Sequence, residues 1–201
     1  MNLSTRMVTV LTAVGLLSGG FLTSVGLLTE ERIALNKAKE IEEAIIQVVP
    51  GSTASEKLFE EKGLSVYGVK DAEGNLLGYA IYASGMGFQD TITFMLGTNA
   101  SLTKINGLYI LEQKETPGLG AKITDRKFFL QYWENRDSRI PLSLHKPAAS
   151  APEDLGPSEI NTITGATISS EAVLNIANSS LERVRHLIKE GVLKSKVRDG
   201  D

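Results

Sequence analysis

The sequence predicts an α+β fold, in which a small and mostly antiparallel sheet packs with helices behind one N-terminal transmembrane helix. Three observations support this prediction. A long uncharged apolar segment lies near the N-terminus, hydrophobic residues alternate along the middle of the chain, and a helical period of about 3.6 residues returns near the C-terminus. With 201 residues, the chain has room for one ordinary domain and an appendage.

Composition excludes several classes of function. The net charge of -3 at pH 7 provides no basic surface for nucleic acid, so we expect no nucleic-acid partner. The chain has no cysteine, which excludes disulfides, thiolate ligands and cysteine nucleophiles. Its two histidines, His145 and His186, lie far apart in the sequence. We therefore predict no metal site built from the chain's own side chains.

Residues 7–28 contain no charged side chain, and as a helix these 22 residues would span the roughly 30 Å hydrocarbon core of a membrane. A cleaved signal peptide is the alternative, but its apolar part has only about 7 to 15 residues. We therefore interpret residues 1–28 as a single-pass membrane anchor. The charged residues on its two flanks do not decide which side of the membrane the domain occupies.

We expect residues 29–63 to form a stalk and linking helices. Apolar residues follow a helical spacing to about Val49, and Pro50-Gly51 ends that helix. A second, short helix is expected over residues 54–62, and it ends at Gly63.

Residues 64–192 form the predicted globular domain, and its first part has the period of two that is typical of strands. The glycine and asparagine at positions 74 and 75 favour a hairpin turn between the first two strands. The loop Ser84-Gly85-Met86-Gly87-Phe88 lies between later strands. Its glycines would let the backbone approach a flat ligand, although an ordinary connecting turn explains them equally well. The strands are expected at residues 65–70, 76–83, 91–96 and 103–111.

The segment Glu115-Thr116-Pro117-Gly118-Leu119-Gly120 follows the last of these strands. Pro117 fixes one backbone angle, and Gly118 suits the third position of a type II turn. A helix is expected over residues 125–135. Its aromatic side chains would form either part of the core or a wall of a pocket for an aromatic ligand, and they are Phe128, Phe129, Tyr132 and Trp133.

The C-terminal part is expected to hold a long irregular connection and one amphipathic helix. Residues 138–158 are rich in proline, serine and alanine, and we assign His145 no role beyond exposure to solvent. The helix is predicted over residues 170–190 and is ended by Gly191. Residues 193–201 form a charged tail.

The segment Thr164-Gly165-Ala166-Thr167-Ile168-Ser169-Ser170 places small residues and hydroxyl groups directly before this helix. A helix start offers unpaired N–H groups and the positive end of the helix dipole, and both stabilise a phosphate. Thr167, Ser169 or Ser170 would also serve as an ordinary N-cap. Gly165 and Ala166 add something that a cap does not require, because they clear space around Thr167. A serine hydrolase is disfavoured, since no histidine lies nearby and the glycine spacing of a nucleophile elbow is missing.

Three segments carry a resemblance to a known family, namely residues 164–167, 115–120 and 85–88. Together they resemble the FMN-binding domain of the Rnf and Nqr respiratory complexes. The resemblance covers residues 67–189 and the anchor. For a short chain with a single anchor, it implies the G subunit of an Rnf complex, an electron-transfer component that is not catalytic alone.

The resemblance implies that FMN is the cofactor and that Thr167 carries it, through an ester between the threonine oxygen and the FMN phosphate. A dedicated flavin transferase that uses FAD would make this bond. We expect Gly118 and Gly120 to bring backbone N–H groups against the isoalloxazine ring, with Glu115 and Thr116 at its edge. Either Ser169 or Ser170 would then cap the helix. The other implied cofactor-binding residues are Thr164, Gly165, Ala166, Ser169, Glu115, Thr116, Gly118, Leu119 and Gly120.

The implied function is electron relay within a membrane complex that couples electron exchange between ferredoxin and NAD to the translocation of Na⁺ or H⁺. The implied partners are the other subunits of that complex, the flavin transferase during maturation, and the membrane. The family places this domain on the extracytoplasmic, or periplasmic, side of the cytoplasmic membrane.

The resemblance leaves one departure and two alternatives. The family's attachment pattern usually has an acidic residue six positions before the modified threonine, where this chain has Asn161. If that carboxylate helps the transferase, attachment will be slower here. One alternative is the C subunit of a Na⁺-translocating NADH:quinone reductase, which has the same flavin chemistry and usually a longer chain. The other is a flavin-bearing sensor or assembly module with no electron-transfer role.

Overall fold

The structure is a computed structural model that describes residues 2–193, and it divides into two compact units at residues 41 and 42. The first unit consists of the N-terminal part of helix α1 (Leu3–Val48), whose apolar side chains are exposed. Within the described residues, α1 is the one helix long and apolar enough to cross a membrane. The stalk helix predicted after residue 28 is a continuation of α1 and not a separate element.

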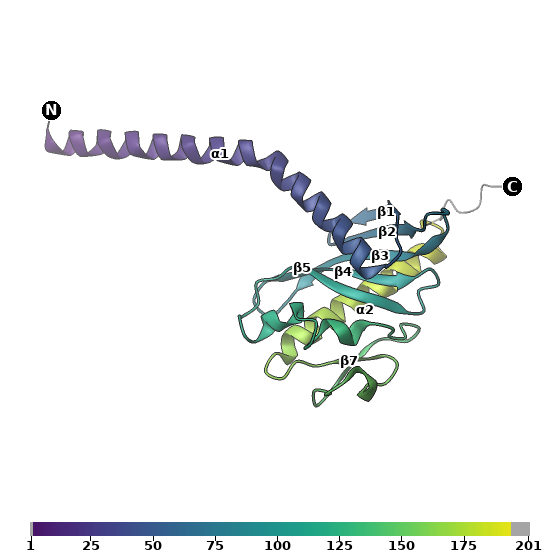
Figure 1. Cartoon of the computed structure of the whole chain (residues 1–201). Coiled ribbons are helices and arrows are strands. Elements are labelled where there is room, and N and C mark those ends of the chain that lie inside the picture. Colours follow the sequence, from purple (N-terminus) through teal and green to yellow (C-terminus); the bar gives the residue numbers. More distant parts are fainter. Residues whose placement is uncertain (1, 194–201) are drawn as a thin grey trace. The chain divides into compact units, whose positions relative to one another are not determined.

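The second unit is built on a five-stranded sheet, and the predicted α+β fold is confirmed. The strands lie side by side in chain order, as Figure 1 shows, and every neighbouring pair is antiparallel. The predicted hairpin turn forms, because the Asp71 carboxylate accepts the Asn75 N–H at 2.7 Å. The strands are β1 (Ala54–Glu61), β2 (Leu64–Lys70), β3 (Leu76–Met86), β4 (Thr91–Asn99) and β5 (Ile105–Glu112).

The helix predicted over residues 54–62 is wrong, because this segment is the edge strand β1. A bulge between Lys57 and Phe59 breaks the alternation of the strand. As a result, Leu58 and Phe59 both pack against the core although they are adjacent in sequence. The glutamates and lysines that favour a helix suit an exposed sheet edge, where charge opposes pairing with another chain.

Short elements connect the sheet to the last helix. The helix predicted over residues 125–135 is wrong, since the segment folds into turns and one 3-10 helix. The Asp125 carboxylate accepts the N–H groups of Lys127 and Phe128, and this local bonding competes with a regular helix. The elements are the 3-10 helices η1 (Gly120–Thr124), η2 (Leu130–Trp133) and η3 (Pro152–Asp154), and the strands β6 (Ser143–His145) and β7 (Glu159–Asn161).

The irregular connection predicted at residues 138–158 contains more order than expected. Its strand β6 pairs in parallel with β7. His145 is part-buried, and its Nδ1 atom lies 2.9 Å from the Glu159 carboxylate, so the prediction of plain exposure is wrong. The Gly156 N–H, with a further contribution from His145, lowers the pKa of Glu159. These contacts give the connection a fixed conformation.

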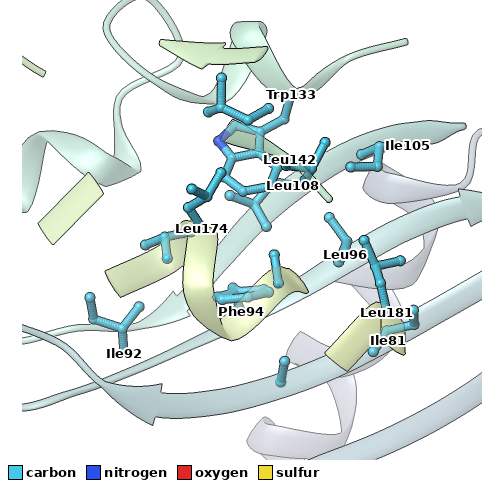
Figure 2. Packing of buried hydrophobic residues seen from close by; sticks show 14 of the residues in the cluster. Ile81, Ile92, Phe94, Leu96, Ile105, Leu108, Trp133, Leu142, Leu174 and Leu181 are labelled. Carbon is cyan, nitrogen blue, oxygen red and sulfur yellow. The ribbon is translucent and has the colours of Figure 1, made fainter. Parts of the chain in front are cut away.

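Helix α2 (Thr167–Lys189) covers one face of the sheet and forms the main core with it. Its apolar side chains recur at helical spacing and form one hydrophobic face, and alternate residues of the strands pack against this face. The strands β2 and β4 are buried on both of their faces. Figure 2 shows sheet residues such as Ile81 and Leu96 together with Leu181 of α2 in this core. Trp133 and Phe129 close the core with their rings in an edge-to-face arrangement, 5.7 Å apart. The packing fixes where the first turn of α2 lies.

The last turns of α1 belong to the second unit and pack on the opposite face of the sheet. Ala44, Ile45 and Val48 are buried there. Gly97 of β4 makes this contact possible, because a Cβ at Gly97 would overlap the carbonyl group of Val48. A Cβ at neighbouring Gly107 would have Val48 at 4.0 Å, which is ordinary contact.

This difference between two paired strand glycines gives a matched test of how the end of α1 packs. We expect Gly97→Ala to lower the free energy of unfolding by about 2 kcal/mol or more, because the methyl group overpacks the interface. Gly107→Ala should change it by less than about 1 kcal/mol, since the added methyl group makes only ordinary contact. Urea unfolding of the full chain in detergent measures both. Equal effects of the two substitutions would contradict this packing.

Candidate functional site

A cavity of about 140 Å³ lies where three separate segments meet. One segment is the turn after β3, the second follows β5, and the third is the start of α2. All the predicted site residues except Thr164 and Gly118 line this cavity. Its lining residues are Phe88, Glu115, Thr116, Leu119, Gly120, Gly165, Ala166, Thr167, Ile168 and Ser169.

The start of α2 supplies the polar end of this cavity. The helix begins at Thr167, and Ala166 is its N-cap without a side-chain hydrogen bond. The first intrahelical bond at this end runs from the Ser170 N–H to the Ala166 carbonyl. Within residues 2–193, no acceptor is found for the N–H groups of Thr167, Ile168 and Ser169. These donors and the positive helix end make the first turn a seat for an anion.

The prediction that Ser169 or Ser170 caps the helix is wrong, because both hydroxyls lie within the first turn and have other partners. Ser169 donates to the Glu115 carboxylate at 2.6 Å. Ser170 donates to the Ala166 carbonyl at 3.0 Å and accepts the Ile163 N–H at 3.2 Å. In the described chain, the Thr167 hydroxyl has no hydrogen-bond partner and its side chain is only half-buried. The Thr116 hydroxyl also lines the cavity without a side-chain hydrogen bond in the described chain, but only the Thr167 hydroxyl lies at the start of α2.

Glu115 lines the cavity and connects the three segments. Its side chain is buried, with 4% of the residue exposed. One carboxylate oxygen accepts the N–H groups of Phe88 and Gln89, at 2.8 and 3.1 Å. The other oxygen accepts the Ser169 hydroxyl. Both oxygens thus face protein donors, whereas the sequence had suggested that Glu115 contacts the edge of a flavin.

The turn that follows Glu115 has the predicted conformation. Gly118 has a φ of +76°, and the Leu119 N–H bonds to the Thr116 carbonyl at 3.1 Å, as expected when glycine occupies the third position of a type II turn. Gly118 lies on the surface outside the cavity lining, while Gly120 lines it. The conformation of this turn brings Leu119 to the cavity.

Large apolar side chains surround the mouth of the cavity. Phe88, Leu119 and Ile168 line it and are each about half exposed, at 59, 48 and 57%. Neither Phe88 nor Ile168 was among the predicted site residues. Exposure is the signal that distinguishes them, because from sequence alone an apolar residue beside a turn is expected in the core. The mouth therefore presents an apolar rim next to the anion-binding end.

A second cavity, of about 320 Å³, lies beside the first. Thr164 lines it and is absent from the lining of the first cavity, so the structure separates Thr164 from the other predicted site residues. The aromatic cluster divides here, because Phe129, Tyr132 and Trp133 are buried in the core while Phe128 is 45% exposed. Phe128 and Tyr132 both line the second cavity, and none of the four lines the one that contains Thr167.

Asn161 also lies in the wall of the second cavity. Its amide oxygen accepts the Ala149 N–H at 2.7 Å, and its amide nitrogen donates to the Ala149 carbonyl at 3.3 Å. The side chain is 3% exposed. An aspartate at this position would keep the first bond and lose the second. Asn161 therefore fixes the connection before the Thr167 turn.

Comparison with known proteins agrees with this geometry. Residues 87–182 match the FMN-binding domain family, and they contain all the segments that form the cavity. This segment is an FMN-binding domain. The cavity is suited to such a ligand, because an anion seat for a phosphate adjoins an apolar rim for a flat ring.

Two relatives align with a longer part of the chain than residues 87–182. The chain is 28% identical over 163 residues to the G subunit of the ion-translocating oxidoreductase complex of Methanosarcina acetivorans, covering 78% of this chain and 81% of the relative. It is also 28% identical over 153 residues to the G subunit of the Na⁺-translocating ferredoxin:NAD⁺ oxidoreductase complex of Acetobacterium woodii, covering 76% and 67%.

A solved structure shares the fold of the FMN-binding domain. It is the C subunit of the Na⁺-translocating NADH-quinone reductase from Parabacteroides distasonis, with a TM-score of 0.51 and 23% identity. The match covers 66% of this chain and 64% of that chain. At this identity the likeness concerns the fold alone.

The two bonds of Ser170 hold the Ile163–Thr167 turn against the helix, and this gives a prediction for stability. Ser170→Ala leaves the Ile163 N–H without its partner, and we expect a loss of about 1–3 kcal/mol in the free energy of unfolding. Ser180→Ala is the matched control, since Ser180 is buried on the same helix and has no side-chain hydrogen bond in the described chain. Chemical unfolding compares them. A loss no larger for Ser170→Ala than for the control would contradict the role of Ser170.

Proposed function

We propose that this chain is the membrane-anchored G subunit of an ion-translocating ferredoxin:NAD⁺ oxidoreductase complex of the Rnf type. In this proposal an FMN bound covalently to Thr167 relays electrons between redox centres of the complex. The single observation that carries the assignment to Thr167 is the state of the hydroxyls in the cavity. Ser169 has a protein partner, and Thr116 lies on the segment after β5. The Thr167 hydroxyl has no partner in the described chain and lies at the anion-binding end of α2.

The attachment step is a phosphoryl transfer from FAD, carried out by a flavin transferase. The Thr167 oxygen forms a bond to the phosphorus on the FMN side of the diphosphate, and the bond from that phosphorus to the AMP oxygen breaks. AMP leaves, and the hydroxyl proton passes to a base of the transferase. No net oxidation occurs. The product is a phosphodiester with a single negative charge, beside the free N–H groups of the first turn.

Residues of this chain would hold the flavin in two parts. The first turn of α2 would hold the phosphate, and the apolar rim of Phe88, Leu119 and Ile168 would border the ring. The bound flavin supplies one-electron chemistry, and the protein supplies position and electrostatics. In this proposal the Gly120 N–H contacts the ring and Thr116 contributes to binding around the attachment point, whereas Gly118 and Thr164 lie outside the cavity and make no direct contact.

The relatives support membership of a larger complex. Both are named as the G subunits of ion-translocating oxidoreductase complexes, and the Acetobacterium woodii protein is named for ferredoxin and NAD⁺. The apolar part of α1 supports membrane anchoring, since its side chains are exposed over a length sufficient to cross a bilayer. We further propose that the FMN-binding domain lies outside the cytoplasmic membrane. Protection of this domain from protease added to intact spheroplasts would contradict that orientation.

The covalent attachment is tested by mass spectrometry of the mature protein. We expect the mass to exceed that of the chain by the mass of FMN less one water, and peptide mapping should locate this increment on Thr167. Thr167→Ala should abolish the increment, because the acceptor oxygen is gone. Thr164→Ala is the matched control, since this hydroxyl lies in the neighbouring cavity and should leave the increment in place. An unmodified Thr167 in an active complex would exclude covalent relay.

Electron relay is distinguished from a sensor or assembly role by the activity of the assembled complex. We expect membranes that carry Thr167→Ala to lose ferredoxin-dependent NAD⁺ reduction by at least about 100-fold, because the relay cofactor is absent. The amounts of the other subunits, measured in the same membranes, control for assembly. Undiminished electron flow in the variant would favour the sensor or assembly role.

A further inference from the structure

Among the described residues, Glu115 is the one buried carboxylate in the wall of the Thr167 cavity, and it bonds to two segments besides its own. Its bonds to the Phe88 and Gln89 N–H groups hold the turn after β3. Its bond to the Ser169 hydroxyl holds the first turn of α2. The Glu115 N–H in turn bonds to the Gln113 side chain at 2.7 Å, which fixes Glu115 at the end of β5.

Two glycines leave room for this carboxylate. A Cβ at Gly87 would lie 2.5 Å from one carboxylate oxygen of Glu115. A Cβ at Gly120 would lie 2.6 Å from the other oxygen and 2.5 Å from the Ser169 hydroxyl. Neither glycine is among those with a positive φ, so both positions require the absence of a side chain and not an unusual backbone. At Gly120 the room is required by Glu115 together with Ser169, and at Gly87 by Glu115 together with the Asp90 carbonyl group and Ile92.

The groups bonded to Glu115 belong to the two segments that would touch the flavin. Phe88 belongs to the apolar rim, and its own N–H is held by Glu115. Ser169 follows the acceptor Thr167 by two residues in the same turn of helix. A shift of the carboxylate would therefore move the rim and the attachment point relative to each other.

We propose that Glu115 is a positioning residue that sets the distance between the Phe88 turn and the Thr167 helix start, and so shapes the seat for the flavin. This inference rests on the proposed placement of the flavin phosphate at Thr167. It assigns Glu115 a role through Phe88 and Ser169, without direct contact between its oxygens and the ring.

The proposal predicts a particular order among three variants. Glu115→Gln keeps an oxygen for the Phe88 and Gln89 N–H groups, and its amide nitrogen can donate to the Ser169 hydroxyl. Glu115→Ala removes all three bonds. Ser169→Ala removes only the bond to the helix. Glu112→Gln is the control, because Glu112 is an exposed carboxylate at the end of β5, three residues before Glu115.

The experiment titrates FMN into the full chain, purified in detergent from cells that lack the transferase, and follows quenching of flavin fluorescence. We expect Kd to rise about tenfold for Glu115→Ala and about threefold or more for Ser169→Ala, because the hydrogen bonds that hold the two segments in place are lost. Glu115→Gln should restore Kd to within about twofold of the wild-type value, and Glu112→Gln should leave it unchanged.

Near-ultraviolet circular dichroism identifies variants that have lost the fold. If Glu115→Ala does not fold, Ser169→Ala and Glu115→Gln still test the proposal, because each substitution changes only one polar group and leaves the rest of the side chain in place. A folded Ser169→Ala with the wild-type Kd would overturn the proposal, and so would a Glu115→Gln that binds as weakly as Glu115→Ala. Failure of covalent attachment is seen separately, in the mass of wild-type protein exposed to transferase and FAD, and leaves this titration interpretable.

Discussion

The packing of α2 along one face of the sheet is the constraint on which the site depends. Thr167 and Glu115 are far apart in the chain, and they line one cavity only because the helix lies where the sheet's hydrophobic face places it. The Ser169–Glu115 bond then joins the first turn of that helix to the end of β5. Hydrophobic packing thus gives the approximate placement, and a buried hydrogen bond with specific geometry fixes it.

The chemistry of the site follows from this placement. A helix start is a general anion seat, and on its own it selects no particular ligand. Here the seat adjoins Phe88, Leu119 and Ile168, so the cavity combines a place for a phosphate with a border for an aromatic ring. A phosphodiester at this point carries one negative charge near the positive helix end, where the electrostatic interaction is favourable.

Sequence reasoning succeeded where a local pattern determines the structure. The strands β2 to β5 and the helix α2 were predicted from the periods of two and about 3.6 residues that their apolar side chains follow where helix and sheet pack together. It failed at residues 54–62, where a bulge in an edge strand places the adjacent Leu58 and Phe59 on the core, and at residues 125–135, where Asp125 bonds its own backbone. The site residues were found through motifs. The hydrogen-bond partners of Glu115 and the exposure of Phe88 were not predicted, because both depend on contacts between distant segments.

The central claim, that Thr167 holds FMN as a phosphodiester, is tested most directly by ³¹P NMR of the purified flavin-bearing protein across pH 5 to 8. A phosphodiester has no second ionisation, whereas a phosphate monoester titrates with a pKa of about 6. The account predicts a single phosphorus resonance whose chemical shift does not change over this range. A resonance that shifts with a midpoint near pH 6 would show a monoester and would contradict attachment through the Thr167 oxygen.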